Sequence, residues 1–405
     1  MITENSQFDV CIIGAGMVGA ACACLLARQG AQVALIEPYL PSTFDPSQAP
    51  DLRVSALNRH SLDLLDSVGA LKLIMAMRYR SYSYLEVWES DFSKTRFDSA
   101  DIGEQQIGIF AENRIIQLAL LEVLKRDFSD YVTLHRAKAS SIDIVSGEVS
   151  LQDIENESSD GSSRKHHLKA QIIIGADGAN SQVRRIADIG QTGWEYAQQA
   201  NLFAVNMHDK IADETWQQFT PQGPVALLPM HESFASLVWY ADAQTSSALK
   251  HMDNEHLKSA IRAKFPDRLG DFDLIDKAGF SLTRMHAKHY HKHRAVLIGD
   301  SAHTINPLAG QGVNLGFKDV AALCKVLDES SAEDIHNSHK LSALFDNYEK
   351  GRRPQNLLMM SSMDALYKTF GNDVPGLKAI RNLALLAAQR AGPAKNIALK
   401  YAMGI

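Results

Sequence analysis

One glycine pattern near the start of the chain constrains the fold more than any other feature. Residues 9–19 read DVCIIGAGMVG, an apolar run that ends in three spaced glycines and continues into a helical pattern. About twenty residues further on, a second apolar run ends at Glu37. Gly14 permits a tight turn, Gly16 lets a pyrophosphate approach the backbone, and Gly19 lets helix and strand pack closely. Because Glu37 is placed to hold an adenosine ribose, the sequence predicts one dinucleotide-binding strand, turn and helix.

Length and composition limit the classes of function. The chain has 405 residues, 45% hydrophobic and 22% charged, which is enough for two globular domains. Its net charge of −6 argues against a nucleic-acid partner. The uncharged stretch 10–27 holds the spaced glycines, so we interpret it as a buried strand and helix and not as a membrane span. Four cysteines without CxxC or CxxxxC spacing exclude the disulfide reductases. We expect no secretory leader, no metal site and a cytoplasmic location.

The alternation of patterns predicts a discontinuous first domain. Short aromatic or β-branched runs between 202 and 242, broken by Pro and Gly, predict an antiparallel sheet. Continuous apolar runs at 170–175 and 294–298 are typical of buried parallel strands. We therefore expect an α/β fold with a discontinuous Rossmann-type nucleotide-binding domain, an inserted antiparallel-sheet substrate domain and a helical C-terminus. The predicted ranges are 1–75, 103–185 and 285–340 for the first domain, 76–102 and 186–284 for the second, and 341–405 for the C-terminal helices.

Four local patterns add detail. Residues 53–71 read as one helix and 113–124 as another. The proline-rich stretch 38–52 predicts an exposed loop, and the polar stretch 153–167 predicts the solvated tip of a hairpin. The run MHAKHYHKHR contains four histidines together with Lys and Arg, and neither a carboxylate nor a cysteine. We interpret it as a solvated turn and not as a metal site; the histidines are His286, His289, His291 and His293.

Two later segments indicate that the nucleotide is a flavin. Residues 172–184 (IIIGADGANSQVR) end a strand at Asp177 and Gly178. Residues 295–319 (AVLIGDSAHTINPLAGQGVNLGFKD) end a strand at Gly299 and Asp300, followed by a glycine-rich loop and a helix. A strand-end aspartate can accept hydrogen bonds from a polyol chain, and a helix N-terminus can stabilise a reduced flavin ring. Either segment alone is also typical of an ordinary turn, whereas both together with the glycine pattern predict flavin binding.

In this order the three motifs resemble the FAD-dependent aromatic hydroxylases of the p-hydroxybenzoate hydroxylase class, over most of the chain. Within that class, DLRVSALN (51–58), ADGANSQVR and GDSAHTINPLAGQGVNLG resemble the hydroxylases of ubiquinone biosynthesis. The segments WEYAQ, TWQQFTPQGP, ASLVWY and ALKYAMGI are most similar to the family members that hydroxylate demethoxyubiquinol. The resemblance implies FAD as cofactor, NAD(P)H as electron donor, O2 as co-substrate and a polyprenylated benzoquinol as substrate.

The resemblance also implies positions for the cofactor. Glu37 and the fingerprint glycines would hold the AMP half of FAD, Arg53 would reach its pyrophosphate or ribityl region, and Asp300 would bind the ribityl hydroxyls. A nicotinamide donor would dock transiently in a groove near Asp177 and Arg184. Gln117 stands where the class often has Arg. The predicted cofactor set is Gly14, Gly16, Gly19, Glu37, Arg53, Gln117, Asp177, Gly178, Gly299, Asp300, Pro307, Gly310, Gln311, Gly312 and Asn314.

The chemistry implied by the resemblance is monooxygenation. Reduced flavin would take up O2 as a C4a-hydroperoxide, and the quinol ring would attack its distal oxygen while the protein excludes water. The sequence identifies no catalytic base, because a histidine in a flavin loop, here His303, is more typical of a structural hydrogen bond. Four aromatic residues are candidates for the wall of the substrate pocket and equally for the core of the sheet; they are Trp216, Phe219, Trp239 and Tyr240.

Alternatives remain open at this stage. A sister hydroxylase acting on another ring carbon, a flavin-dependent prenyl-lipid reductase or cyclase, and a non-catalytic flavin-binding scaffold all fit the motifs, whereas a halogenase lacks its WxWxIP segment. Partners could be a ubiquinone-biosynthesis assembly, the inner membrane or further copies of the chain. Residues 377–405 alternate apolar groups with basic ones and contain no acidic residue. This pattern predicts an apolar helical face with a basic rim, which either meets lipid or a lipid-carrying partner, or packs on the flavin domain.

Overall fold

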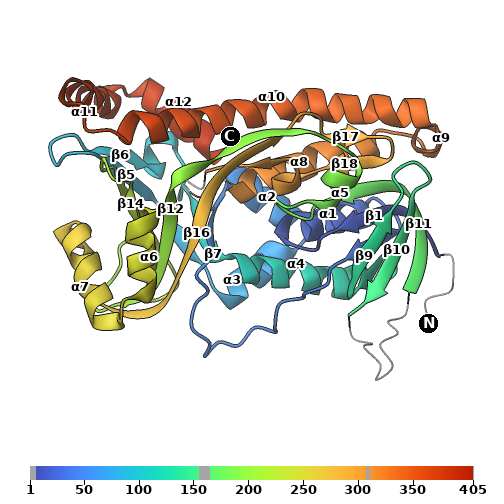
Figure 1. The fold of residues 1–405 in the computed structure, drawn as a ribbon, viewed down its shortest axis with the longest axis horizontal. Coiled ribbons are helices and arrows are strands. Elements are labelled where there is room, and N and C mark those ends of the chain that lie inside the picture. Colours follow the sequence, from blue (N-terminus) through green and yellow to red (C-terminus); the bar gives the residue numbers. More distant parts are fainter. Residues whose placement is uncertain (1–5, 155–164, 307–309, 311, 405) are drawn as a thin grey trace.

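Two eight-stranded sheets lie side by side in the computed structural model, which describes residues 6–154, 165–306, 310 and 312–404. Helix α10 (Ser338–Phe370) runs along one edge of the molecule across both sheets (Figure 1). Among the described residues, no helix is both long and apolar enough to cross a membrane.

The first sheet has a parallel centre. Its order is β17-β18-β11-β1-β2-β8, with β10 and β9 continuing from β11, and β18, β11, β1, β2 and β8 run parallel. The apolar second half of β1 is buried because the strand is central. The strands are β1 (Ser6–Ile13), β2 (Val33–Ile36), β8 (Val132–His135), β9 (Ala137–Ile142), β10 (Glu148–Asp153), β11 (Lys165–Gly175), β17 (His291–Lys292) and β18 (Ala295–Leu297). The accompanying helices are α1 (Met17–Arg28), α4 (Asn113–Asp127), α5 (Gln182–Ile186), α8 (Gly312–Asp328) and α9 (Ala332–His336).

The second sheet is antiparallel except where β13 pairs with β5. Its order is β19-β16-β12-β15-β14-β13-β5-β6, and helices α6 (Ala243–His251) and α7 (Asn254–Lys264) cover one face (Figure 1). The other face packs against α10. The strands are β5 (Tyr84–Trp88), β6 (Thr95–Asp98), β12 (Gln191–Met207), β13 (Glu214–Gln218), β14 (Val225–Pro229), β15 (Phe234–Asp242), β16 (Phe272–Ala287) and β19 (His303–Thr304).

A small three-stranded sheet corrects one expectation. Residues 53–71 do not form a single helix: β3 (Val54–Asn58) pairs with β7 (Gly108–Glu112), which also pairs with β4 (Arg80–Tyr82). The side chain of Asn58 accepts a hydrogen bond from the backbone N–H of Ser61 at 3.1 Å and so caps the next helix. This cap begins α2 (Arg59–Ser67), and α3 (Ala70–Met77) follows.

The remaining expectations for the fold are largely confirmed. The stretch 10–27 forms β1 and α1, 113–124 lies in α4, and the end of the chain is helical, with α11 (Pro375–Arg390) and α12 (Pro393–Met403) after α10. Single 3-10 turns are η1 (Ser99–Ile102), η2 (Asp267–Leu269) and η3 (Gly299–Ser301). The expected hairpin tip lies between β10 and β11, mostly outside the described residues. The proposed domain boundaries remain predictions.

The histidine run corrects a second expectation. His286 is not part of a solvated turn: it lies at the end of β16, is buried, and contacts the hydroxyl of Tyr290 at 3.0 Å through its Nε2. Met285 and Ala287 on either side of it are buried as well, so the whole end of β16 lies in the interior. Within the described part of the chain, no cluster of His, Cys, Asp and Glu has the geometry of a metal site.

Candidate functional site

Four strand ends meet at one edge of the first sheet. In the parallel ladders, Ile13 at the end of β1 is paired with Ile36 at the end of β2 and with Gly175 at the end of β11. Gly175 is in turn paired with Leu297 at the end of β18. The residues that follow these strands are therefore neighbours, although they come from four separate parts of the chain. This is the edge at which parallel α/β sheets bind ligands.

The fingerprint glycines have different local roles. Gly14 has φ of +101°, and a Cβ there would lie 2.5 Å from the carbonyl oxygen of Ala176. A Cβ on Gly19 would lie 1.9 Å from the carbonyl oxygen of Gly14, so the turn and the packing of α1 both require glycine. By contrast, a Cβ on Gly16 would meet no described atom within 4 Å. The loop is therefore open at Gly16, as close approach of a pyrophosphate to the backbone requires.

Two side chains hold the loop from the neighbouring elements. Oε2 of Glu37 accepts a hydrogen bond from the N–H of Ala15 at 2.9 Å, and its Oε1 accepts one from the N–H of Tyr39 at 3.0 Å. From α4, Nε2 of Gln117 donates to the carbonyl oxygen of Ala15 at 2.8 Å. Gln117 thus braces the fingerprint loop, which gives this amide a definite place beside the predicted nucleotide.

The segment after β11 is anchored by its own side chains. Oδ2 of Asp177 accepts from the N–H groups of Gln182 at 2.6 Å and Val183 at 3.2 Å, whereas its Oδ1 is buried with no described hydrogen-bond partner. Gly178 has φ of +77° and is open on its Cβ side. Asp177 therefore orders the start of α5 and keeps one acceptor free.

The groove expected near Asp177 and Arg184 for a nicotinamide donor stays a prediction, but Arg184 itself has a structural role. Its guanidinium is buried and donates to the carbonyl oxygens of Ser301 and Ala179, each at 2.7 Å. It joins the segment after β11 to the segment after β18. Because the guanidinium is occupied inside the protein, Arg184 is a positioning residue and not an accessible binding site for a nucleotide donor.

Asp300 is the exposed acid at this strand edge. Its carboxylate is open to solvent and makes no hydrogen bond to a described residue. The surrounding protein nevertheless raises its pKa by desolvation, while the nearby charges of His303 and Arg53 lower it. Arg53 is also exposed, and its charge acts on Asp300 although no described ion pair joins the two side chains. A polyol and a pyrophosphate are chemically suited to this pair.

A buried network that the sequence did not reveal supports the Gly299–Asp300 turn. Oδ2 of Asp319 in α8 accepts from the N–H of Gly299 at 3.1 Å and from Nε2 of His303 at 2.5 Å. Its Oδ1 accepts from Nε of Arg352 at 2.8 Å and from Nδ2 of Asn356 at 3.0 Å. His303 is therefore held in the structural hydrogen bond expected of it. The available signal was a carboxylate within the apolar run of α8, but its partners are distant in sequence.

The glycine-rich loop after β19 is only partly described. Pro307 and Gln311 of the predicted set lie outside the described residues, whereas Gly310 has φ of +63° and Gly312 begins α8. The side chain of Asn314 is buried, and its Nδ2 donates to the carbonyl oxygen of Ala56 at 2.8 Å. Its Oδ1 accepts from the N–H of Asn58 at 3.1 Å. Asn314 thus fixes the start of α8 to β3.

The four candidate aromatics divide between the two faces of the second sheet. Trp216 and Trp239 pack with Phe265 on the face covered by α6 and α7, so both belong to the core and do not wall a pocket on the opposite face. Successive side chains of a strand point to opposite faces, and Tyr240 accordingly lies on the α10 side. Its hydroxyl donates to Oδ1 of Asn306 at 3.0 Å, directly before the glycine-rich loop.

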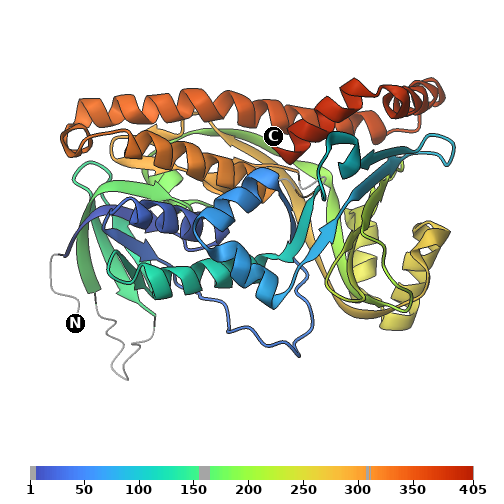
Figure 2. The same cartoon turned by 180° about the vertical axis from the view of Figure 1, so that it is seen from behind.

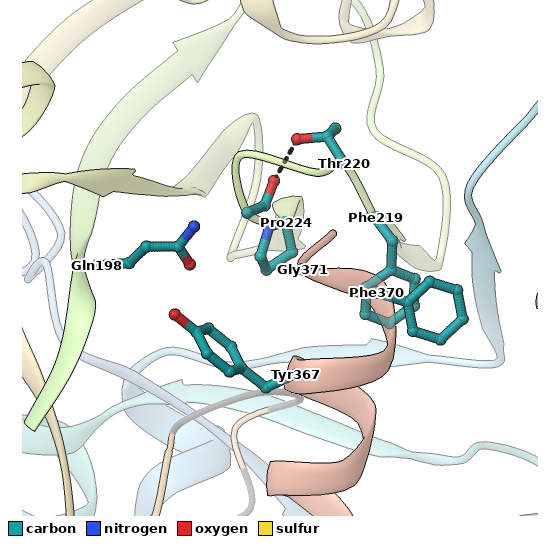
Figure 3. Close-up of a pocket in the computed structure, with 8 residues that line it drawn as sticks. Gln198, Phe219, Thr220, Pro224, Tyr367, Phe370 and Gly371 are labelled. Atoms are coloured by element: carbon teal, nitrogen blue, oxygen red, sulfur yellow. Dashed lines mark hydrogen bonds between the residues drawn. The ribbon is translucent and has the colours of Figure 1, made fainter. Parts of the chain in front are cut away.

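Phe219 lines a small pocket against the end of α10. Its ring stacks on Phe370 with the ring centroids 4.1 Å apart, and the Tyr367 side chain extends toward Gln198 across the pocket (Figure 3). Oε1 of Gln198 is buried without a described partner. The pocket is mostly apolar.

The chain is similar to known proteins that bind FAD. A family model described as "FAD binding domain" matches residues 7–361. The 3-demethoxyubiquinol 3-hydroxylase of Escherichia coli (strain K12) is 40% identical over 99% of this chain and 100% of that protein. The chain belongs to the family of FAD-binding hydroxylases of ubiquinone biosynthesis. Ubiquinone hydroxylase UbiL of Rhodospirillum rubrum is 33% identical over 98% of this chain and 89% of that protein.

A solved structure supports the fold assignment. The p-nitrophenol 4-monooxygenase PnpA from Pseudomonas putida DLL-E4 has a TM-score of 0.78 at 17% identity, with 99% of each chain covered. At this identity the match concerns the fold alone. The expected fold class, an α/β protein with a Rossmann-type FAD-binding part, an antiparallel sheet and a helical C-terminus, is confirmed, and so is membership of the FAD-dependent monooxygenases.

Proposed function

We propose that this chain hydroxylates the aromatic ring of a polyprenylated benzoquinol at the demethoxyubiquinol step of ubiquinone biosynthesis. The similarity to the Escherichia coli hydroxylase over both full lengths supports this step against the sister hydroxylases. The observation that carries the proposal is the meeting of three groups at one strand edge: an open glycine loop at Gly16, the acid Glu37, and the carboxylate of Asp300, which bonds to no described residue.

The chemistry of these residues fits FAD. The N-terminus of α1 and Gly16 would receive the pyrophosphate, Glu37 the adenosine ribose, and Asp300 with Arg53 the ribityl and phosphate region. The bound flavin supplies the redox and oxygen-transfer chemistry. The chain's own tasks are to hold the flavin through the Asp319 network, to exclude water, and to place the quinol ring on the α10 face of the second sheet.

We further propose that NAD(P)H is the electron donor and O2 the co-substrate. The donor would approach near Gly178, where the backbone is open, because the Arg184 guanidinium is already bound inside the protein. The four cysteines are buried and free, which supports a reducing, cytoplasmic location. A peripheral contact with the inner membrane or with a ubiquinone-biosynthesis assembly would bring the enzyme to its insoluble substrate.

Turnover of a short-tailed demethoxyubiquinol tests the function. The FAD-loaded protein is given the reduced quinol, NADH or NADPH and isotopically labelled O2, and the products are analysed by mass spectrometry and NMR. We expect one labelled oxygen atom on the ring, at the carbon that lacks the methoxy group. Incorporation at another carbon would assign a sister hydroxylase. Flavin oxidation without any labelled product would favour a reductase, a cyclase or a scaffold.

A further inference from the structure

Helix α11 is amphipathic, but it buries its polar side chains and exposes its apolar ones. The side chains that it buries are polar: Arg381 and Asn382 are each 3% exposed. The side chains on its outer face are large and apolar, with Leu377 48% exposed and Ile380 and Leu383 each 64% exposed. A surface helix of a water-soluble domain normally buries its apolar stripe. The outward apolar face of α11 therefore needs an explanation other than core packing.

A buried ion pair fixes this orientation. Arg381 holds Glu89 in two places, with Nη2 2.5 Å from Oε1 and Nε 3.2 Å from Oε2. Nδ2 of Asn382 donates to the same Oε2 at 3.0 Å, and its Oδ1 accepts from the hydroxyl of Ser93. Rotating α11 to bury its apolar face would leave the charge of Glu89 buried and unpaired, which is strongly unfavourable. The sequence thus specifies that the apolar face points outward.

Helix α12 extends the same arrangement. Leu399 and Met403 are buried in a cluster with the small sheet, and this anchors the helix. On its outer side, Ile397 is 68% and Tyr401 50% exposed. Both helices lie on the outside of the molecule, next to the end of α10 (Figures 1 and 2). We call their outer residues the C-terminal surface: Val374, Leu377, Ile380, Leu383, Ile397 and Tyr401.

The charge around the C-terminal surface indicates what kind of partner this surface binds. Residues 374–404 contain five cations and no Asp or Glu, in a chain whose net charge is −6. Arg381 is bound to Glu89, and Lys395 lies 3.0 Å from Asp101. Arg390 and Lys400 are exposed and form no ion pair with a described residue, whereas Lys378 is half-buried and lies on the same side of α11 as Arg381 and Asn382. Symmetric pairing with a second copy would bring these cations together, whereas an anionic lipid surface complements both the apolar face and the positive rim.

We propose that the C-terminal surface docks the protein on an anionic lipid bilayer. The apolar side chains of α11 and α12 enter the headgroup region, and Arg390 and Lys400 meet the lipid phosphates. The alternative that this stretch packs wholly on the flavin domain is excluded by the exposure of Ile380, Leu383 and Ile397. The inference rests on the proposed function only for its purpose, which is access to a substrate dissolved in the bilayer.

Vesicle flotation of the FAD-loaded, full-length protein tests the proposal. The vesicles contain either phosphatidylethanolamine with phosphatidylglycerol or neutral phosphatidylcholine alone. One variant reverses the rim (Arg390→Glu, Lys400→Glu), and a second removes the apolar face (Ile380→Gln, Leu383→Gln, Ile397→Gln). Matched controls change exposed residues elsewhere: Lys72→Glu and Lys125→Glu for charge, and Met75→Gln, Leu134→Gln and Val145→Gln for apolarity.

We expect the parent protein and both controls to float with the anionic vesicles, and each surface variant to lose binding about tenfold or more. FAD content and the melting temperature show that the variants are folded. No binding by the parent, or equal losses in variants and controls, would overturn the proposal. So would a dimer in sedimentation that only the surface variants dissociate, since a second copy would then cover the surface. Flotation measures binding and needs no turnover. Its result therefore does not depend on whether the hydroxylation assay succeeds.

Discussion

The side chains of His303 and Asp319 meet in the interior with Nε2 2.5 Å from Oδ2, directly behind the turn that carries Asp300. The same oxygen of Asp319 accepts the N–H of Gly299, so one buried carboxylate holds both the beginning of the turn and its continuation in β19. Burial raises the pKa of Asp319, but His303 and Arg352 outweigh burial and lower it to about 2. The turn that carries Asp300 is therefore held in place by the buried charge of Asp319 in α8.

Replacing the charge of Asp319 should weaken the predicted FAD site, because this carboxylate holds the Gly299–Asp300 turn. Asp319→Asn preserves the size of the side chain but leaves Arg352 buried without its ion-pair partner, a change that costs about 3–5 kcal/mol in comparable sites. We expect a clearly lower melting temperature and loss of FAD on gel filtration. Retention of both would show that the Gly299–Asp300 turn is held by other contacts. Lys325→Gln on the exposed side of the same helix is the matched control.

A buried histidine predicts how stability depends on pH. Burial, followed by the charges of His303 and of the nearby arginines Arg353 and Arg284, lowers the pKa of His286 from 6.5 to about 4. Between pH 4 and pH 6.5 the imidazole of His286 is protonated in the unfolded chain but neutral in the folded protein. The free energy of unfolding therefore has its full value above pH 6.5 and falls as the pH decreases from 6.5 toward 4. His286→Gln removes this titration. Denaturant unfolding across this range should therefore show a flatter pH dependence in the variant; parallel curves would contradict the assignment.

Gly16 allows a steric test of the fingerprint. Its φ of −63° and ψ of −179° are accessible to any residue, and its Cβ position is clear of described protein atoms. Gly16→Val should therefore fold, but its side chain would occupy the position predicted for the pyrophosphate. We expect apoprotein with a melting temperature close to that of the parent's apoprotein. A full yellow flavin spectrum in the purified variant would contradict the predicted role, and Gly351→Val in α10 controls for an added side chain in an open position.

Asp300→Ala tests the ribityl contact. A charge-assisted hydrogen bond to a flavin hydroxyl contributes about 1.5–3 kcal/mol, which corresponds to about a 10- to 100-fold increase in the Kd for FAD. The carboxylate bonds to no described residue, so its removal should change the thermal stability of the apoprotein little. Titration of the apoprotein with FAD, followed by flavin fluorescence, measures the change. An unchanged Kd would mean that another group binds the ribityl chain.

The first sheet could be predicted well because its signals are local. The fingerprint at residues 9–19 and the two later motifs each mark the end of a strand, and parallel strands bring their ends to one edge. The same reasoning failed at 53–71, where apolar spacing continued through β3 into α2 and only the cap at Asn58 divides them. A helical period cannot locate such a boundary when a strand of suitable apolar spacing precedes the helix.

Features that depend on distant partners could not be predicted. Trp239 and Tyr240 are adjacent, and the face that each occupies was set by the packing of α6, α7 and α10 around the sheet. The guanidinium of Arg184 donates in the interior to two carbonyl oxygens, and one of them belongs to Ser301, which is distant in the sequence. Asp319 is an isolated acid in an apolar helix until Arg352 is brought beside it. These features depend on contacts between residues that are far apart in the chain, and such contacts cannot be read from a single sequence.

The C-terminal surface should matter only for substrates that reside in the bilayer. Reversing Arg390 and Lys400 to Glu leaves the strand-edge residues untouched, so FAD content and turnover of a short-tailed quinol should equal those of the parent. On vesicles that contain a long-tailed quinol, turnover should fall about tenfold or more, since the lipid-facing charge changes sign. Raised salt should weaken turnover of the parent on the same vesicles, because screening shortens the reach of the rim cations. Equal losses on both substrates would instead place these cations in the folding or chemistry of the enzyme.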